Sequence, residues 1–321
     1  MRAVVRNTYG SPDVLEFQEI DKPDLTDDGV LVRVHSASIN PADLYTLTGT
    51  PLVARVQSGL RKPKSNRLGV DFAGTVEAVG KDVTQVQPGD EVFGAKSGAL
   101  AEYVCVRDAV VLKPANLTFE SAAAVPVAAL TALQGLRDKG RIQPGQKVLI
   151  NGASGGVGTF AVQIAKVFGA EVTGVCSSRN VDLVRSLGAD HVINYTEEDF
   201  TTSEKRYDLI LDNAGSKSWA QLRRVLNPQA TLVIVGAPKG NRLVGPLSHI
   251  LKVRLAALPS RRNVGFFIAK LTRADTTIMS EFLESGKVIP VIDRNFEMNE
   301  VADAFRHLAE GHARGKIVVS W

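Results

Sequence analysis

The sequence predicts an α/β protein built from a doubly wound parallel sheet and a second, discontinuous β-rich domain. Three observations lead to this fold class: a glycine-rich turn between a strand pattern and a helix pattern, alternating strands and helices after that turn, and short alternating strands before it. At 321 residues and 44% hydrophobic content, the chain is long enough for two ordinary cores. We expect the β-rich domain over 1–120 and 265–321, and the sheet domain over 121–264.

The glycine-rich turn lies in the stretch QKVLINGASGGVGTFAVQIA, residues 146–165. Val148–Ile150 reads as a buried parallel strand, and Phe160, Ala161 and Ile164 recur at helical spacing. The turn fits G-x-G-x-x-G with an alanine in the first position, and bare backbone N–H groups at a helix N-terminus can hold a pyrophosphate. A P-loop does not fit, because no Gly-Lys-Ser/Thr ends the turn. The candidate cofactor-binding residues here are Ala153, Ser154, Gly155, Gly156, Val157 and Gly158.

Short alternating segments separated by Gly, Pro and Asp turns indicate strands in the first 120 residues. We expect them at Arg2–Arg6, Val30–Ser36, Ala73–Val79 and Glu91–Gly94. An alanine-rich helix should follow from Phe119 and be interrupted at Pro126.

The doubly wound sheet has six candidate strands: Lys147–Ile150, Glu171–Cys176, His191–Asn194, Tyr207–Asp212, Ala230–Gly236 and Val253–Leu258. The last part of the chain should contain, in order, helix Thr277–Glu284, strand Val288–Ile292, helix Met298–Glu310 and strand Lys316–Ser320. We expect this part to return to the first domain, which would place a ligand-binding cleft between two lobes.

Composition indicates an ordinary soluble protein. The net charge is +4 with an isoelectric point near 9.0, and the cations are scattered, so we expect no nucleic-acid partner. The densest basic run, Arg61–Arg67, reads as a solvated loop, although it could help admit an anionic cofactor. Two cysteines make neither a metal cluster nor a disulfide framework, and no apolar run reaches the ~18 residues of a membrane span. We expect a cytoplasmic protein, or the mature form of an imported one.

Seven ordered motifs resemble the medium-chain dehydrogenase/reductase superfamily along nearly the whole chain. They are SINPAD (38–43), GVDFAGTVEAVG (69–80), PGDEVFG (88–94), AVPVAALTALQGL (124–136), NGASGGVG (151–158), SLGADHVINY (186–195) and GKIVV (315–319). The likeness is to the zinc-free quinone oxidoreductase branch, and within it to the chloroplast envelope quinone oxidoreductase homologue and alkenal reductases. It implies a Rossmann domain beside a GroES-like catalytic domain.

The metal-ligand positions of this family hold other residues here. Zinc-dependent relatives carry a Cys before an Asp-containing turn and a His-Glu pair after a glycine, whereas this chain has Asn40 and the pair Val70-Asp71. Asn and Val are not usual zinc ligands, and two cysteines cannot build a four-Cys structural lobe. We therefore expect no metal, and a site suited to hydride addition to an electrophilic quinone or α,β-unsaturated carbonyl.

The end of the second sheet strand indicates the cofactor. Proteins that bind NAD have an acidic residue there, which accepts a hydrogen bond from the ribose 2′-OH. This chain instead has Ser177, Ser178 and Arg179, which suit the 2′-phosphate of NADPH. Alternatively, the serines cap the next helix and Arg179 is solvated. The nearest acid, Asp182, should lie one turn into that helix. The resemblance adds Tyr195 at the adenine-phosphate end.

The resemblance also implies which residues surround the nicotinamide. These are Asn40, Thr131, Asn213, Gly236, Ala237, Gly315 and Lys316. The candidate catalytic residues are Asn40, Asp43 and Tyr45, which could stabilise negative charge on a carbonyl oxygen or supply a proton. Each has an ordinary alternative: Asn40 initiates a turn, Asp43 caps a helix, Tyr45 is a core aromatic and Lys316 is a surface lysine.

The leading hypothesis is an NADPH-dependent, zinc-independent oxidoreductase that transfers hydride to quinones or to the C=C bond of α,β-unsaturated carbonyls. An NADPH-binding sensor or structural protein without significant turnover is the alternative from another class, and a module for polyketide-like acyl thioesters is a further enzymatic one. We also expect a homodimer, with the strand ATLVIVG (230–236) or its neighbours as a possible interface.

Overall fold

Two units make up the chain in the computed structural model, which describes residues 1–236, 243–260 and 262–321. Unit 1 comprises Met1–Leu130, Lys270–Gly286 and Pro290–Trp321, and unit 2 comprises Thr131–Ala269 and Lys287–Ile289. These bounds differ from the expected ones at three places. Residues 121–130 lie in unit 1, where helix α3 (Phe119–Ala123) packs on its sheet. Residues 265–269 lie in unit 2, where they complete and follow its last strand, and residues 287–289 also belong to unit 2.

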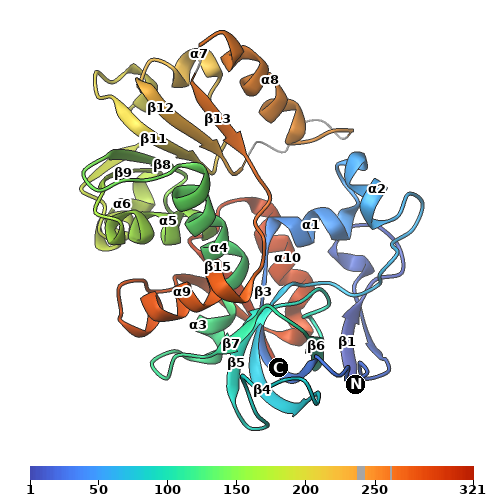
Figure 1. Ribbon diagram of the computed structural model, residues 1–321. Coiled ribbons are helices and arrows are strands. Elements are labelled where there is room, and N and C mark those ends of the chain that lie inside the picture. Colours follow the sequence, from blue (N-terminus) through green and yellow to red (C-terminus); the bar gives the residue numbers. More distant parts are fainter. Residues whose placement is uncertain (237–242, 261) are drawn as a thin grey trace. The chain divides into compact units, whose positions relative to one another are not determined.

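The sheet of unit 2 has six parallel strands in the order β10-β9-β8-β11-β12-β13 (Figure 1). The strands are β8 (Lys147–Asn151), β9 (Glu171–Cys176), β10 (His191–Asn194), β11 (Tyr207–Asp212), β12 (Leu226–Ile234) and β13 (Asn263–Phe266). The helices are α5 (Gly156–Val167), α6 (Val181–Ser186), α7 (Trp219–Leu222) and α8 (Leu247–Ala257). Figure 1 shows α5 and α6 on one side of the sheet and α7 and α8 on the other, which is the doubly wound arrangement that the sequence predicts.

Unit 1 is β-rich and is assembled from both ends of the chain. Its main sheet has the order β14-β15-β3-β4-β5-β7, β6 pairs with β3, and β1 and β2 form a separate pair. The strands are β1 (Arg2–Val5), β2 (Glu16–Glu19), β3 (Val30–Ile39), β4 (Asp71–Val79), β5 (Glu91–Ala95), β6 (Tyr103–Val106), β7 (Val110–Leu112), β14 (Ile292–Glu297) and β15 (Lys316–Ser320). Its helices are α1 (Pro41–Thr48), α2 (Arg55–Ser58), α3 (Phe119–Ala123), α9 (Arg273–Glu284) and α10 (Val301–Glu310). The expected break at Pro126 is present, because α4 (Pro126–Gln134), which runs from unit 1 into unit 2, starts at that proline.

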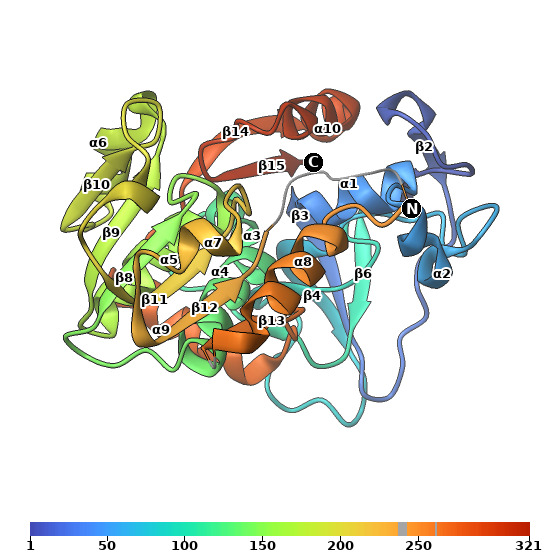
Figure 2. The same cartoon turned by 90° about the horizontal axis from the view of Figure 1, so that it is seen from above.

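The last strand and helix close the core of unit 1. Figure 2 shows α10 alongside β14 and β15. Phe305 of α10 is fully buried with Ile317 of β15 and Ile39 of β3 in one apolar cluster. This packing explains why the C-terminal segment returns to the N-terminal domain.

Two expectations about strands are wrong. Val253–Leu258 lies mostly in helix α8, because this apolar run lacks period-2 alternation and its Leu, Ala, Lys and Arg residues favour a helix. In Val288–Ile292 the strand begins only at Ile292, since Pro290 cannot donate to a ladder. The expected interface at 230–236 or its neighbours stays a prediction: β12 lies inside the sheet between β11 and β13, and its neighbour β13 is the edge strand.

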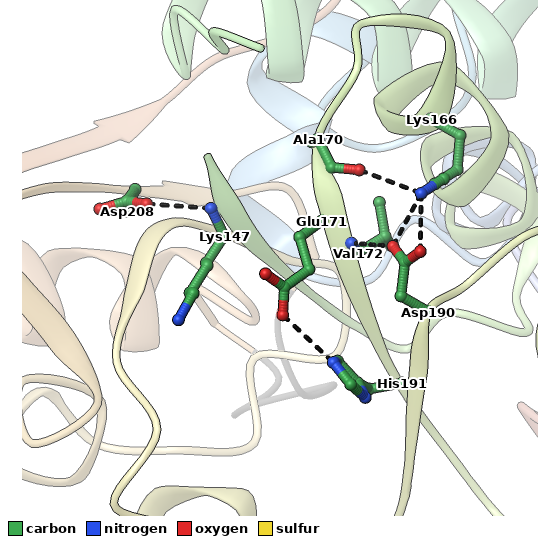
Figure 3. Close-up of polar contacts among 8 residues, drawn as sticks. All are labelled: Lys147, Lys166, Ala170, Glu171, Val172, Asp190, His191 and Asp208. Atoms are coloured by element: carbon green, nitrogen blue, oxygen red, sulfur yellow. Dashed lines mark hydrogen bonds and ion pairs between the residues drawn. The ribbon is translucent and has the colours of Figure 1, made fainter. Parts of the chain in front are cut away.

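Polar contacts tie together the amino ends of strands in unit 2 (Figure 3). Asp190 accepts hydrogen bonds from the Lys166 ammonium at 2.8 Å and from the Val172 N–H at 2.7 Å, while His191 lies 3.1 Å from Glu171. Exposed pairs of this kind contribute at most about 1 kcal/mol each. They stabilise the sheet at the amino ends of its strands. The opposite side, where the carboxyl ends of the strands lie, is left for ligands, and we call it the carboxyl edge.

Candidate functional site

The predicted cofactor-binding residues of unit 2 gather at the carboxyl edge of the sheet. Five adjacent strands contribute to this edge: Tyr195 follows β10, 177–179 follow β9, 153–158 follow β8, Asn213 follows β11, and Gly236 lies two residues after β12. Ligands of doubly wound sheets bind outside this edge, at the point where the strand order reverses. That point lies here between β8 and β11, because the helix after β8 and the helix after β11 cover opposite faces.

Two glycines of the glycine turn have different surroundings. Gly155 has open space beside it for a ligand, whereas Gly158 has no space for a side chain. A Cβ on Gly158 would lie 2.0 Å from the Gly152 carbonyl oxygen, so this glycine is required for helix α5 to pack against the turn. A Cβ on Gly155 would meet only the Gly152 oxygen, at 3.6 Å. Gly155 is the N-cap of α5, and the first N–H groups of a helix have no partner within it. The turn therefore forms an open anion-binding helix end.

Asn180 links the glycine turn to the end of β9. Its Nδ2 donates to the Ser154 hydroxyl at 2.9 Å and to the Ser177 hydroxyl at 3.2 Å. Asn180 directly follows Arg179 in the sequence CSSRN (176–180), and the sequence alone gave it no role. Ser177 occupies the N-cap position of the short 3-10 turn Ser178–Asn180, but its side chain makes no capping hydrogen bond there. The side chain of Arg179 is exposed beside it.

The acid nearest to the end of β9 lies away from it, as expected. Asp182 is the second residue of α6, its side chain is fully exposed, and it lies 3.7 Å from Arg185. Tyr195 is 56% exposed, and its N–H donates to the Cys176 carbonyl at 3.0 Å. The end of β9 therefore presents hydroxyls and a guanidinium without an adjacent carboxylate among the residues that directly follow the strand.

Asn213 carries unsatisfied polar atoms at the centre of the edge. Among the described residues, neither its buried Nδ2 nor its buried Oδ1 has a hydrogen-bond partner. Gly236 lies against it, since a Cβ there would be 1.9 Å from the Asn213 carbonyl oxygen. Buried amides are normally satisfied, so an unpaired one at the reversal point fits a bound polar ligand. Together with the open helix end, this donor set fits a nicotinamide dinucleotide.

The structure gives less information about two of the predicted cofactor-binding residues. Thr131 lies in α4 and is the first residue of unit 2. Ala237 lies outside the described residues.

In unit 1 a buried carboxylate, Asp71, collects four donors. It is fully buried and accepts from the Ser38 hydroxyl at 2.9 Å, the Asn40 Nδ2 at 2.9 Å, the Val127 N–H at 2.9 Å and the Lys316 ammonium at 3.3 Å. Sequence reasoning considered Asp71 only as a failed zinc-ligand position. We call Asn40, Asp43, Asp71 and Lys316 the buried polar cluster.

Lys316 is a buried cation and not the surface lysine of the alternative interpretation. It is 3% exposed, and its Nζ donates to the Asn40 Oδ1 at 2.5 Å as well as to Asp71. Gly315 allows the chain to approach β14 here, because a Cβ would lie 2.2 Å from the Val291 carbonyl oxygen. The Asn40 amide is oriented by this network, with Oδ1 toward the ammonium and Nδ2 toward the carboxylate, which leaves one Nδ2 hydrogen for a ligand.

Asp43 caps helix α1, as its alternative interpretation stated. Its Oδ2 accepts from the Asn40 N–H at 2.8 Å, and burial raises the pKa of this carboxyl to about 7. Tyr45 lies two positions further along α1, where residues project to a different side, so it is not part of the cluster. Burial also raises the pKa of the Tyr45 hydroxyl, which keeps it protonated near neutral pH.

The cluster does not fit a catalytic metal. The side chains at the ligand positions are those of Asn40, Val70 and Asp71, and the ammonium of Lys316 already contacts both polar members. A second cation there would face like charge. Among the residues that the structure describes, no three His, Cys, Asp or Glu side chains gather in a way that could hold a metal ion.

Two family models match the chain. One, described as "Alcohol dehydrogenase GroES-like domain", matches residues 26–116, and one described as "Zinc-binding dehydrogenase" matches residues 187–319. The first lies in the β-rich unit 1 and the second runs from unit 2 back into unit 1.

Curated proteins and solved structures show likeness over the whole chain. The mouse protein "NAD(P)H oxidoreductase RTN4IP1, mitochondrial" is 38% identical over 354 residues, covering 100% of this chain and 89% of that protein. The Arabidopsis thaliana protein "NADPH-dependent alkenal/one oxidoreductase, chloroplastic" is 34% identical over 340 residues, covering 99% and 79%. The solved quinone oxidoreductase from Coxiella burnetii has a TM-score of 0.87 at 31% identity, covering 100% of this chain and 99% of that one.

Proposed function

Since the chain belongs to the medium-chain dehydrogenase/reductase superfamily, in its zinc-free quinone oxidoreductase branch, we propose that it uses NADPH to reduce quinones or the C=C bond of α,β-unsaturated carbonyls. Membership of this family makes the chain an oxidoreductase with a nicotinamide cofactor. The phosphorylated cofactor and the class of acceptor are the proposed part.

The carboxyl edge of unit 2 is the single observation that supports the cofactor proposal best. Its open helix end would hold the pyrophosphate, and the unsatisfied Asn213 amide would meet a polar group of the dinucleotide. Ser177, Ser178 and Arg179 would hold the 2′-phosphate, since hydroxyls donate and a guanidinium pairs bidentately with phosphate oxygens. When bound, NADPH supplies a hydride from C4 of its nicotinamide.

The buried polar cluster of unit 1 supports the acceptor proposal. Hydride addition to an enone or quinone places negative charge on a carbonyl oxygen, which needs fixed donors or positive charge. Asn40 has one N–H left to donate, and the Lys316 ammonium keeps one hydrogen beyond its bonds to Asn40 and Asp71. Because Asp71 holds both groups, they need no reorganisation when the charge develops, and one such donor is typically worth about 3 kcal/mol.

An NADPH-oxidation screen across quinones, 2-alkenals of graded chain length and an enoyl thioester tests the activity. We expect steady turnover with at least one quinone or enone. Tight NADPH binding without turnover across the panel would overturn the enzyme proposal and favour the sensor or structural alternative. Faster turnover of the enoyl thioester than of the quinones and 2-alkenals would make acyl thioesters the acceptor class.

The cofactor preference has a separate test in Arg179→Asp. A carboxylate at this position would repel the 2′-phosphate and could accept from a ribose hydroxyl, so we expect the NADPH-to-NADH ratio of kcat/KM to fall at least tenfold, roughly the loss of one charge-assisted hydrogen bond. Arg185→Asp makes the same charge change six residues further along the chain, in α6 at a residue that contacts Asp182, and should leave the ratio nearly unchanged. An unaltered ratio in Arg179→Asp would remove the 2′-phosphate assignment.

Homodimer formation and compartment also remain proposals. Sedimentation velocity tests the dimer, for which β13, at the end of the sheet order, is the edge that a second chain could pair with. The mouse and Arabidopsis relatives are named mitochondrial and chloroplastic, so the expected cytoplasmic location needs direct imaging. No helix in the described part of the chain has the length and apolarity to cross a membrane.

A further inference from the structure

Helix α8 buries one apolar face and exposes another. The buried face, formed by Ile250, Val253 and Ala257, packs in the core of unit 2. The exposed face carries four leucines at spacings of four, four and three residues, which places them within about 80° of one another on a helix. We call this set the leucine row: Leu247, Leu251, Leu255 and Leu258, which are 43%, 58%, 56% and 72% exposed.

The segment of the chain that carries the leucine row is rich in cations. Residues 213–274 contain eleven Lys and Arg residues and no Asp or Glu, although the whole chain has 34 acids to 38 cations. Lys252 and Arg254 are exposed on α8, and the helical spacing places them on opposite flanks of the leucine row. Neither lies within ion-pair distance of a carboxylate among the described residues.

An arginine-lined hollow lies just beyond the end of α8. It has a volume of about 370 Å³ and is lined by Arg223, Arg224, Pro228, Ser260 and Arg262. Arg262 Nη1 donates to the Arg223 carbonyl oxygen at 2.8 Å, which fixes that guanidinium at the rim. Three of the lining residues are arginines, and a guanidinium group can pair with two oxygens of a phosphate.

We propose that this face of unit 2, the leucine row with the arginine-lined hollow, docks onto a membrane surface that carries anionic phospholipids. A helix with an apolar side flanked by cations lies in the plane of a bilayer interface, with its apolar residues among the acyl chains and its cations at the headgroups. Figure 1 shows α8 on the side of the sheet away from α5 and α6, at the surface of unit 2. This inference rests on α8 and its charges and is independent of the proposed reaction.

Charge complementarity favours this occupant over two others. A second copy of the chain pairing through the same face would bring the exposed cations of two α8 helices together. A nucleic acid would satisfy the cations but leave the leucine row in water. Of the three, only an anionic lipid surface provides both apolar acyl chains for the leucine row and negatively charged phosphates for the arginines.

Co-sedimentation of the full chain with vesicles tests the proposal. We expect binding to phosphatidylcholine vesicles that contain phosphatidylserine, weak binding to vesicles of phosphatidylcholine alone, and a loss of binding as salt is raised. Lys252→Gln/Arg254→Gln should lower the partition coefficient about 30-fold, from the contribution of two cations near an anionic surface. Leu251→Gln/Leu255→Gln should lower it at least about tenfold.

Matched controls change the same chemistry elsewhere. Arg61→Gln/Lys62→Gln removes two exposed cations from unit 1, and Leu112→Gln removes a leucine that is 52% exposed. Both should bind vesicles like the parent chain, and NADP⁺ binding shows that every variant is folded.

Three results would overturn the proposal. The first is a failure to bind vesicles that contain phosphatidylserine, and the second is a loss of binding in Arg61→Gln/Lys62→Gln as large as that in Lys252→Gln/Arg254→Gln. If Leu251→Gln/Leu255→Gln changes the sedimentation coefficient in the absence of lipid, the leucine row is a contact between copies of the chain and the membrane assignment is also wrong.

Discussion

Asp43 carries a carboxylate in a place that disfavours its charge. Burial raises its pKa to about 7, whereas an unfolded chain loses this proton near pH 3.9. Between these values the folded state binds more protons than the unfolded state, so the contribution to stability is full below about pH 4 and is lost as the pH rises through about 7. The folded chain should therefore be more stable on the acidic side, where Asp43 is buried without a charge.

We predict that Asp43→Asn flattens this pH dependence. The amide can still accept from the Asn40 N–H but has no charge to bury. Urea unfolding between about pH 4 and 8 should show a falling unfolding free energy for the parent chain and a flatter profile for the variant. The exposed Asp24→Asn is the control, and an Asp43→Asn profile parallel to that of the parent would contradict the assignment.

Asp71 and Lys316 should behave as a coupled pair. Removing one partner of a buried ion pair leaves an uncompensated charge and typically costs about 3–5 kcal/mol. We therefore expect Asp71→Asn and Lys316→Met each to lower the unfolding free energy by about 3 kcal/mol, and the double variant to lose much less than the sum. Ser38→Ala removes an uncharged donor to the same carboxylate and should cost about 1 kcal/mol. Additive losses in the cycle would show that the two charges do not interact.

Residues of this cluster could be predicted from the sequence only in part. Asn40, Asp43 and Lys316 were found through the family resemblance, but the residue that joins two of them was not. The donors to Asp71 come from positions 38, 40, 127 and 316, so no local spacing brings them together. The unpaired amide of Asn213 also depends on what surrounds it in space and leaves no signature in the chain.

At the scale of elements, the strongest local sequence patterns were sufficient to predict strands with their correct bounds. The strands Glu171–Cys176, His191–Asn194, Tyr207–Asp212 and Lys316–Ser320 have the predicted bounds, because short β-branched runs between turns leave little choice. Helix α8 was mistaken for a strand, since its second apolar face is exposed and hides the usual amphipathic pattern. The strand at 288 was misplaced for a tertiary reason: the Gln163 amide, not a neighbouring strand, bonds both backbone groups of Ile289.

The glycine turn before α5 offers a matched pair of substitutions. Gly158→Ala places a methyl against the Gly152 carbonyl, so we expect a loss of about 3 kcal/mol of stability and no cofactor binding. Gly155→Ala meets no close atom and has an ordinary φ of −82°, so it should stay within about 1 kcal/mol of the parent while its methyl occupies the approach of a phosphate. We expect its NADP⁺ affinity, measured by calorimetry, to fall at least tenfold. Unchanged affinity in a folded Gly155→Ala would show that the pyrophosphate binds elsewhere.

At the scale of the whole molecule, the two units can be observed separately because each contains one of the two tryptophans. Trp219 is 6% exposed in α7 of unit 2, and Trp321 is half-buried at the end of unit 1. Trp321→Phe therefore leaves a fluorescence reporter for unit 2, and Trp219→Phe leaves one for unit 1. Most of the predicted dinucleotide contacts lie in unit 2, so the cofactor should stabilise that unit more.

We predict that NADP⁺ at about 100 times its Kd raises the unfolding free energy reported by Trp219 by about 2.7 kcal/mol, and that reported by Trp321 by less. NADP⁺ is preferred to NADPH here because the reduced nicotinamide absorbs tryptophan emission. Urea titrations of both single-tryptophan variants, with and without cofactor, give the two values. Equal shifts would mean that the units unfold as one body, and a larger shift at Trp321 would mean that the cofactor is held mainly by the β-rich unit.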